Sequence, residues 1–213
     1  MPGAEETCLY LVRHGETDWN REQRLQGTLD VPLNSAGVAQ ARRLAGAFAR
    51  IPIACVVTSP LARASATAVM LARACACPLN TDARLREIDH GTWSGRTLPD
   101  LGRRFPSLVR NEQLLPGAFE VSRGEQLADV SRRSADALAD LIDTYAGQSV
   151  VVVGHGVTLA AMWCVATGLD ITRFHECLPP NAGGVVLTFS RRQLVDAQTM
   201  VLDPEIALPL EKR

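Results

Sequence analysis

The chain alternates between short, continuous apolar runs and longer segments in which apolar residues recur every three to four positions. The apolar runs are typical of buried strands, and the periodic segments are typical of helices with one buried face. We therefore expect strands at 7–12, 53–58, 78–81, 149–153, 185–189 and 194–201. We expect helices at 35–50, 61–76, 125–145 and 157–167. Ser35 is expected to cap the first of these helices.

This alternation predicts an α/β fold with three layers (α/β/α), in which a mostly parallel central sheet carries an antiparallel edge strand. Arg191 and Arg192 are expected at the turn between the last two strands. Residues 84–124 are rich in Gly and Pro and are predicted to be irregular, apart from a helix that includes Arg103 and Arg104. We expect one domain over residues 1–213, in which 98–124 form a lid and 202–213 form a tail.

Composition narrows the class of protein. A chain of 213 residues with 46% hydrophobic content can bury one substantial core, and a net charge of -1 gives no reason to expect a nucleic-acid partner. Of the six cysteines, only Cys75 and Cys77 are close in sequence, and no zinc pattern is completed, so we interpret them as structural thiols. Neither a signal peptide nor a run of membrane-spanning length is visible, and we therefore expect a cytoplasmic protein without a membrane partner.

Three of the predicted strands end directly at groups that can do chemistry. Arg13 and His14 follow the first strand, Ser59 follows the second, and His155 follows the strand at 149–153. The carboxyl ends of parallel strands meet at one edge of a sheet, where ligands bind. Arginine presents a fork that matches phosphate oxygens, and histidine can act as a nucleophile. An Arg-His pair after a strand is by itself more often a solvated strand end, so the hypothesis of phosphoryl transfer at His14 depends on further motifs.

Those further motifs occur in a fixed order along the chain. They are Arg13-His14-Gly15-Glu16-Thr17, Trp19-Asn20, Gln26-Gly27, Ser59-Pro60-Leu61-Ala62-Arg63-Ala64 with Thr67, Leu85-Arg86-Glu87-Ile88 with Gly91, Trp93 and Gly95, and Val153-Gly154-His155-Gly156. In this combination the chain resembles the histidine phosphatase superfamily, also called the phosphoglycerate mutase-like family. Within it, the chain resembles the small bacterial phosphatases. The resemblance spans roughly residues 8–190 and implies a phosphoglycerate mutase-like fold.

The resemblance also implies a role for each matching residue. The expected catalytic residues are His14, Glu87, Arg13, Arg63 and His155, and the expected substrate-binding residues are Asn20, Gln26, Gly27 and Gly156. His14 would attack phosphorus, and Glu87 would act as general acid and then as general base. The two arginines would neutralise the phosphate and keep His14 neutral, so neither a metal nor another cofactor is expected.

Each of these side chains also has a purely structural interpretation. His155 could be a core histidine, Arg63 a surface charge, and Glu87 a partner of the neighbouring Arg84 or Arg86 in a loop ion pair. Ser59 resembles a nucleophile, but the residues around it favour a helix cap. The joint occurrence of the motifs favours the functional interpretation.

Within the family, the run Ile88-Asp89-His90-Gly91 after Glu87 is the phosphatase-like form. We therefore expect a metal-independent phosphomonoesterase that hydrolyses small phosphorylated metabolites. A cofactor-dependent phosphoglycerate mutase, a phosphoprotein-directed regulatory phosphatase and a phosphate-binding module without turnover remain as alternatives, and so does a homodimer. Pro116-Gly117 is followed by Ala118-Phe119, where many small phosphatases have Pro-Gly-Gly-Glu-Ser. The lid is therefore atypical.

Overall fold

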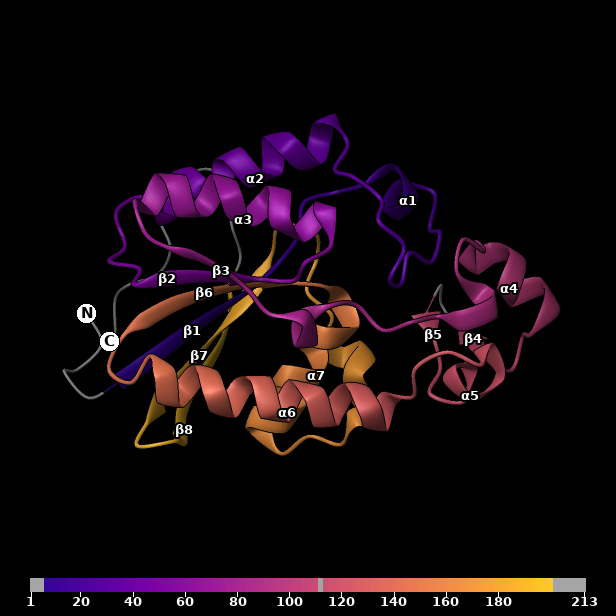
Figure 1. Cartoon of the computed structure of the whole chain (residues 1–213). Coiled ribbons are helices and arrows are strands. Elements are labelled where there is room, and N and C mark those ends of the chain that lie inside the picture. Colours follow the sequence, from indigo (N-terminus) through magenta and orange to yellow (C-terminus); the bar gives the residue numbers. More distant parts are fainter. Residues whose placement is uncertain (1–5, 111–112, 201–213) are drawn as a thin grey trace.

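The structure, a computed structural model, describes residues 6–110 and 113–200. A six-stranded sheet lies between two layers of helices (Figure 1). Its strands, in spatial order, are β3 (Leu79–Thr81), β2 (Cys55–Thr58), β6 (Ser149–Gly154), β1 (Glu6–Arg13), β7 (Gly184–Ser190) and β8 (Gln193–Met200). The strands β3, β2, β6 and β1 pair in parallel. Strand β7 runs antiparallel to both β1 and β8. The predicted fold class is confirmed, with the antiparallel pairing spread over the last two strands.

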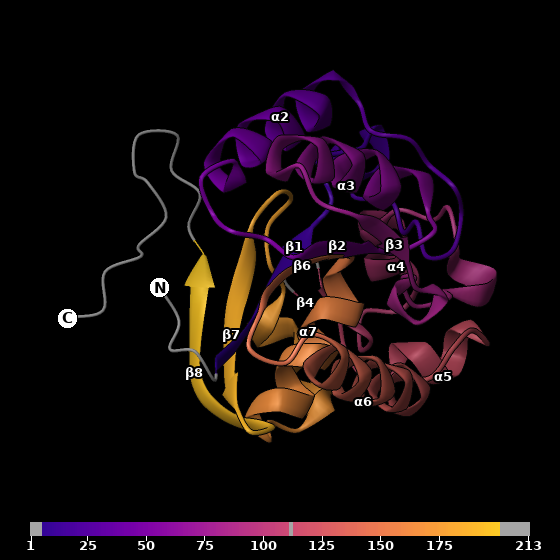
Figure 2. The same ribbon diagram turned by 60° about the vertical axis from the view of Figure 1, so that its left-hand side comes forward.

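Two helices cover each face of the sheet (Figures 1 and 2). The helices α2 (Ser35–Phe48) and α3 (Ala62–Cys75) lie on one face, and α6 (Leu127–Thr144) and α7 (Gly156–Thr167) lie on the other. Smaller elements gather beyond the carboxyl ends of the parallel strands (Figure 1). They are α1 (Asp18–Arg21), α4 (Leu98–Arg104), α5 (Ala118–Ser122), β4 (Val109–Arg110), β5 (Gln113–Leu114) and the 3-10 helices η1 (Ala83–Leu85), η2 (Gly91–Trp93) and η3 (Ile171–Cys177).

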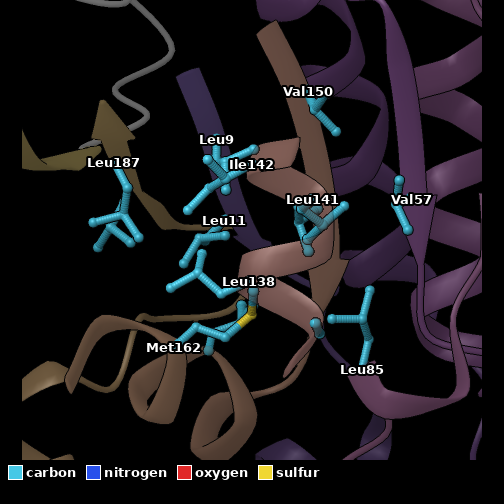
Figure 3. Close-up of a cluster of buried hydrophobic side chains, with 14 of the residues drawn as sticks. Leu9, Leu11, Val57, Leu85, Leu138, Leu141, Ile142, Val150, Met162 and Leu187 are labelled. Atoms are coloured by element: carbon cyan, nitrogen blue, oxygen red, sulfur yellow. The ribbon is translucent and has the colours of Figure 1, made fainter. Parts of the chain in front are cut away.

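The two faces of β1 are buried in different clusters because successive side chains of a strand point to opposite sides. Leu9 and Leu11 pack with α6 and α7, as Figure 3 shows. Tyr10 and Val12 pack with α2 and α3. Burying one leucine contributes about 1.5–3 kcal/mol relative to leaving it exposed. The strands are therefore held firmly on both faces, and so are the residues that follow them.

Two local predictions were wrong. The helix α2 is capped by Asn34 rather than by Ser35, because the Asn34 side-chain oxygen accepts a hydrogen bond of 2.8 Å from Gly37 N–H. The helix predicted around Arg103 and Arg104 is confirmed as α4, but the described residues of the segment predicted to be irregular also contain α5, which was not predicted. Phe119 of α5 and Leu101 of α4 are fully buried in a third apolar cluster, so the lid is part of the folded core.

The predicted tail, 202–213, and the last residue of the predicted strand 194–201 lie outside the described residues. Across the ranges that are described, no single helix is both long and apolar enough to cross a membrane. The pair formed by α7 and η3 would qualify by length and composition, but it is bent by 113°.

Candidate active site

Three neighbouring parallel strands bring their carboxyl ends to one point. In the sheet register Arg13 lies opposite Gly154, and Thr58 lies opposite Val153. The residues that follow, His14, Ser59 and His155, are therefore adjacent. The His14 and His155 ring centroids are 5.1 Å apart, and Ser59 Oγ lies 2.8 Å from His155 Nε2. The convergence predicted from the strand ends is confirmed.

His14 is buried, and its hydrogen bonds define its tautomer. Its Nδ1 lies 2.7 Å from the Gly15 carbonyl oxygen, which can only accept, so Nδ1 carries the proton. Its unprotonated Nε2 has one lone pair, which accepts a long hydrogen bond of 3.3 Å from Arg63 Nε. Burial, and then the charges of Arg13 and Arg63, hold the His14 pKa well below its usual value. The imidazole is therefore neutral at neutral pH, and Nε2 is its nucleophilic atom.

Both predicted arginines are anchored to backbone carbonyls. Arg63 is 1% exposed and donates to Leu29 O and Gly27 O, each at 2.8 Å. Burial lowers the Arg63 pKa to about 10, so this side chain stays charged at neutral pH. Arg13 donates to Pro179 O at 2.8 Å, while its buried Nε has no hydrogen-bond partner in the described part of the chain. Two fixed cations thus flank His14, and the interpretation of Arg63 as a surface charge is wrong.

Glu87 lies at the N-terminus of α7. Its Oε1 accepts hydrogen bonds from Ile88 N–H at 3.0 Å, Thr158 N–H at 3.2 Å and Thr158 Oγ1 at 3.3 Å. Its Oε2 accepts from Val157 N–H at 3.3 Å. Three hydrogen-bond donors thus contact Oε1, whereas Oε2 accepts a single long hydrogen bond. The second oxygen therefore retains more capacity for a further hydrogen bond.

The alternative interpretation of Glu87, a loop ion pair with Arg84, is wrong. Arg84 instead binds Asp82 at 2.7 Å and Asp140 at 2.6 Å. This arrangement leaves Glu87 facing the cavity described below.

The prediction that Ser59 caps a helix is also wrong. The N-cap residue of α3 is Leu61, which makes no side-chain cap bond. Ser59 Oγ does accept a hydrogen bond of 3.3 Å from Leu61 N–H, but this bond lies ahead of the helix. The shorter contact of the Ser59 hydroxyl is the one to His155.

Asn20 lies beside His14 in a small hydrogen-bond network. Its Oδ1 accepts from Thr17 N–H and Thr17 Oγ1, both at 3.0 Å, and from Asn181 Nδ2 at 3.2 Å. The same Asn181 amide donates to His14 O at 3.1 Å. Because its oxygen is occupied, Asn20 offers its N–H groups to a ligand.

The other predicted binding residues are a buried glutamine and two glycines. Gln26 is 7% exposed, and its Oε1 has no partner within the described ranges. The carbonyl of Gly27 is taken by Arg63. A Cβ on Gly156 would lie 3.6 Å from the Arg13 guanidinium carbon, an ordinary contact distance, so the first turn of α7 lies directly beside that cation. As the first residue of α7, Gly156 also has an N–H without an intrahelical partner.

A cavity of about 400 Å³ brings these groups together. Eight of the nine predicted residues line it, namely Arg13, His14, Asn20, Gln26, Gly27, Arg63, Glu87 and Gly156. The ninth, His155, is fully buried and lies outside the lining. Part of the outer wall comes from the lid and from η3, through Leu98, Gln113, Leu114, Phe119 and Phe174. The site therefore combines a cationic floor with a largely apolar rim.

Sequence reasoning gave no role to His90, and it missed Asn181 and Thr158. His90 lines the cavity, is buried, and stacks on Phe119 with ring centroids 6.0 Å apart. Its position directly after the Glu87 segment could have indicated a place in the pocket. Nothing in the sequence near Asn181 indicates its contact with His14. Among the described residues, no group of three or more His, Cys, Asp or Glu side chains could hold a metal ion.

Comparison with known proteins identifies relatives that match most of the chain. The model of the histidine phosphatase superfamily (branch 1) matches residues 9–198. Phosphoserine phosphatase 1 of Hydrogenobacter thermophilus is 35% identical over 187 residues, which cover 88% of this chain and 89% of that protein. A probable phosphoglycerate mutase, GpmB, of Klebsiella pneumoniae is 37% identical over 163 residues, 76% of this chain and 75% of that protein.

A solved structure, that of YhfR of Bacillus stearothermophilus, superposes with a TM-score of 0.79 at 31% identity. The superposition covers 88% of this chain and 94% of the YhfR chain. A family model that spans most of the chain, relatives above 30% identity and a shared fold all point the same way. The chain belongs to the histidine phosphatase superfamily, as its ordered motifs predict.

Proposed function

We propose that this protein is a metal-independent phosphomonoesterase that hydrolyses small phosphorylated metabolites through a phosphohistidine on His14. The observation that carries the proposal is the pairing of a neutral, buried imidazole with two anchored arginines, opposite a carboxylate with one lightly bound oxygen. A phosphoryl group in transfer spreads negative charge over its peripheral oxygens. Fixed cations and N–H donors stabilise that charge where it develops.

In the first step, Arg13, Arg63, Asn20 and the Gly156 N–H bind the phosphoryl oxygens. Arg63 Nε turns its N–H from His14 Nε2 to a phosphoryl oxygen, the lone pair freed on Nε2 attacks phosphorus, and the bond from phosphorus to the ester oxygen breaks. Glu87 gives the proton on its Oε2 to the departing oxygen. The products are an alcohol and a phosphohistidine.

In the second step a water molecule replaces the alcohol. Glu87 removes a proton from this water, whose oxygen attacks phosphorus while the bond to His14 Nε2 breaks. Inorganic phosphate leaves, His14 regains its lone pair, and Glu87 is protonated again. Acid-base catalysis of this kind contributes about 10²–10⁴-fold.

We assign His155 the role of a neutral donor to the phosphoryl group. Its Nδ1 has no partner in the described part of the chain, whereas its Nε2 contacts Ser59. When the Ser59 hydroxyl donates to Nε2, Nδ1 carries the proton and can donate it. The ring is fully buried, so this contact requires a local shift when phosphate binds.

The phosphatase assignment is supported by the similarity to phosphoserine phosphatase 1 and by the phosphatase-like run after Glu87. The second candidate, a phosphoglycerate mutase, is favoured by the similarity to GpmB. The two differ in whether water or a second substrate oxygen accepts the phosphoryl group. The volume of the cavity suits a small ligand in either case.

The test is phosphate release from a panel of phosphomonoesters in the presence of a chelator. The panel contains phosphoserine, 3-phosphoglycerate, sugar phosphates, nucleotides and a phosphotyrosine peptide. We expect chelator-resistant release that is abolished in His14→Ala and reduced at least about a hundredfold in Glu87→Gln. Near-full activity in either variant would refute the mechanism. Release that is absent, together with bisphosphoglycerate-dependent interconversion of phosphoglycerates, would establish the mutase.

A further inference from the structure

A partly buried ion pair lies outside the cavity and has no part in the chemistry above. Arg133 of α6 and Glu125 have side chains that are only 12% and 16% exposed. Arg133 Nε lies 2.7 Å from Glu125 Oε1, and Arg133 Nη2 lies 3.0 Å from Glu125 Oε2, so the pair is bidentate. Buried ion pairs are often no more stabilising than apolar residues of the same size. Stability alone therefore does not explain why this pair is buried here.

Arg133 holds the beginning of the segment that carries Glu87. Its Nη1 donates to the Arg84 carbonyl at 2.5 Å and to Thr158 Oγ1 at 3.4 Å. Thr158 Oγ1 in turn donates to the Arg86 carbonyl at 2.7 Å and lies 3.3 Å from Glu87 Oε1. One guanidinium therefore contacts both the backbone before Glu87 and the threonine that touches its carboxylate.

Glu125 holds the other end of the same segment. Its Oε2 accepts from Asp89 N–H at 3.4 Å, and its own N–H donates to the Asp89 carbonyl at 2.9 Å. The preceding Gly124 lies so close that a Cβ there would be 2.0 Å from the Asp89 carbonyl oxygen. Residues 84–89 are thus clamped at both ends by one ion pair, with Glu87 between the clamped points.

We propose that the Arg133–Glu125 pair is a positioning device for Glu87 and serves the proton-transfer part of the reaction. This inference rests on the proposed function. Proton transfer requires heavy atoms within about 2.6–3.2 Å, and a displacement of about 1 Å can cost two orders of magnitude in rate. Removing Arg133 leaves the Glu125 carboxylate without its partner and the Arg84 carbonyl without this donor. The segment is then free to move, while His14 and the two catalytic arginines keep their own anchors.

The dependence on the leaving group isolates this effect. A p-nitrophenolate leaves without needing a proton, whereas an alkyl alkoxide needs one. We therefore compare kcat/KM, which reports phosphoenzyme formation, for p-nitrophenyl phosphate and for an alkyl phosphate. We expect the fold-loss in kcat/KM caused by Arg133→Met to be at least about ten times larger for the alkyl phosphate than for p-nitrophenyl phosphate. This is less than the full contribution of acid-base catalysis, because Glu87 is displaced but still present. Arg133→Lys keeps the charge but not the fork and should lie between wild type and Arg133→Met.

The chain offers a matched control next to the pair. Arg132 is also on α6, is 70% exposed, and forms an ion pair with Asp129. Arg132→Met makes the same change of side chain, and we expect kcat/KM for both substrates to be unchanged. Glu125→Gln is nearly isosteric, weakens the same clamp, and serves if Arg133→Met fails to fold. The double variant Arg133→Met/Glu87→Gln should resemble Glu87→Gln alone, because the pair acts through that carboxylate.

The outcomes separate this inference from the proposed function. If Glu87→Gln shows no difference between the two substrates, the assignment of Glu87 as general acid is wrong and the positioning role falls with it. If Glu87→Gln discriminates but folded Arg133→Met and Glu125→Gln lose activity equally on both substrates, the inference alone is overturned. A selective loss on the alkyl ester in these variants, absent from Arg132→Met, supports it.

Discussion

The two histidines at the strand ends should make the protein sensitive to mild acid. His14 and His155 both have a pKa well below the usual value. Burial is the main cause for each, followed by Arg13 and Arg63 for His14 and by His14, Arg63 and Arg13 for His155. In the unfolded chain both side chains protonate near pH 6.5. The unfolded state therefore binds more protons below that pH, and the stability present at neutral pH is lost as the pH falls.

The size of the effect follows from proton linkage. Consider a histidine that stays neutral in the folded protein and has a pKa of about 6.5 in the unfolded chain. Lowering the pH from 7.5 to 5.5 then reduces the free energy of unfolding by about 1.4 kcal/mol. Two such residues cost about 2.7 kcal/mol, a large share of the roughly 5–15 kcal/mol that stabilises a typical domain. His90, whose pKa burial also lowers, adds to the loss in the same direction.

The assay is urea unfolding at both pH values in buffers without phosphate, because a ligand of the folded state would add its own stabilisation. The lower pH of 5.5 is still above the pKa values of Asp and Glu in an unfolded chain, about 3.9 and 4.3. Histidines therefore dominate the change in unfolding free energy between the two pH values. His155→Asn should remove about 1.4 kcal/mol of the pH dependence, whatever it does to stability at pH 7.5. Equal unfolding free energies at the two pH values, or an unchanged dependence in His155→Asn, would refute the reasoning.

Two substitutions test individual contacts at the site. Ser59→Ala leaves the buried Nε2 of His155 without its partner and should cost about 1–3 kcal/mol of unfolding free energy, together with a lower kcat. A Ser59→Ala protein of unchanged stability and kcat would contradict the tautomer argument. Gly156→Val places an isopropyl group beside Arg13 and Leu178, and should raise the inhibition constant of inorganic phosphate at least about fivefold, near 1 kcal/mol. In Gly156→Ala the new atom meets these neighbours at 3.4–3.7 Å, ordinary contact distance, so a similar rise there would show that crowding is not the cause.

The layers of the fold were predictable because the chain buries both faces of its strands. Val150, Val151, Val152 and Val153 alternate between the two apolar clusters, and each is fully buried. A short, continuous run of β-branched apolar residues is typical of such a strand, so its position is visible in the sequence. The lid lacks a comparable signal. Its helix α5 is short, and its burial depends on contacts such as the edge-to-face packing of Phe119 on Phe174, far along the chain.

The identity of the site residues was predictable, but their partners were not. A motif fixes the residue type at each strand end, since phosphate chemistry requires cations and a nucleophile there. It does not fix contacts between side chains distant in sequence. The hydrogen bonds from Asn181 to His14, from Ser59 to His155 and from Arg133 to Arg84 span 167, 96 and 49 positions. Such contacts follow from the packing of complete layers, which local patterns do not encode.

In the proposed mechanism, both reaction steps would depend on the short junction between β6 and α7. The first helical N–H groups lack intrahelical partners, and here they are divided between two tasks. Gly156 lines the cavity beside Arg13 and would offer its N–H to the phosphoryl group, whereas Val157 N–H and Thr158 N–H bind the Glu87 carboxylate. His155, directly before them, lies against His14. A displacement of this turn would therefore move the phosphate donors and the general acid together, so both phosphoenzyme formation and its hydrolysis should be impaired by any substitution that shifts it.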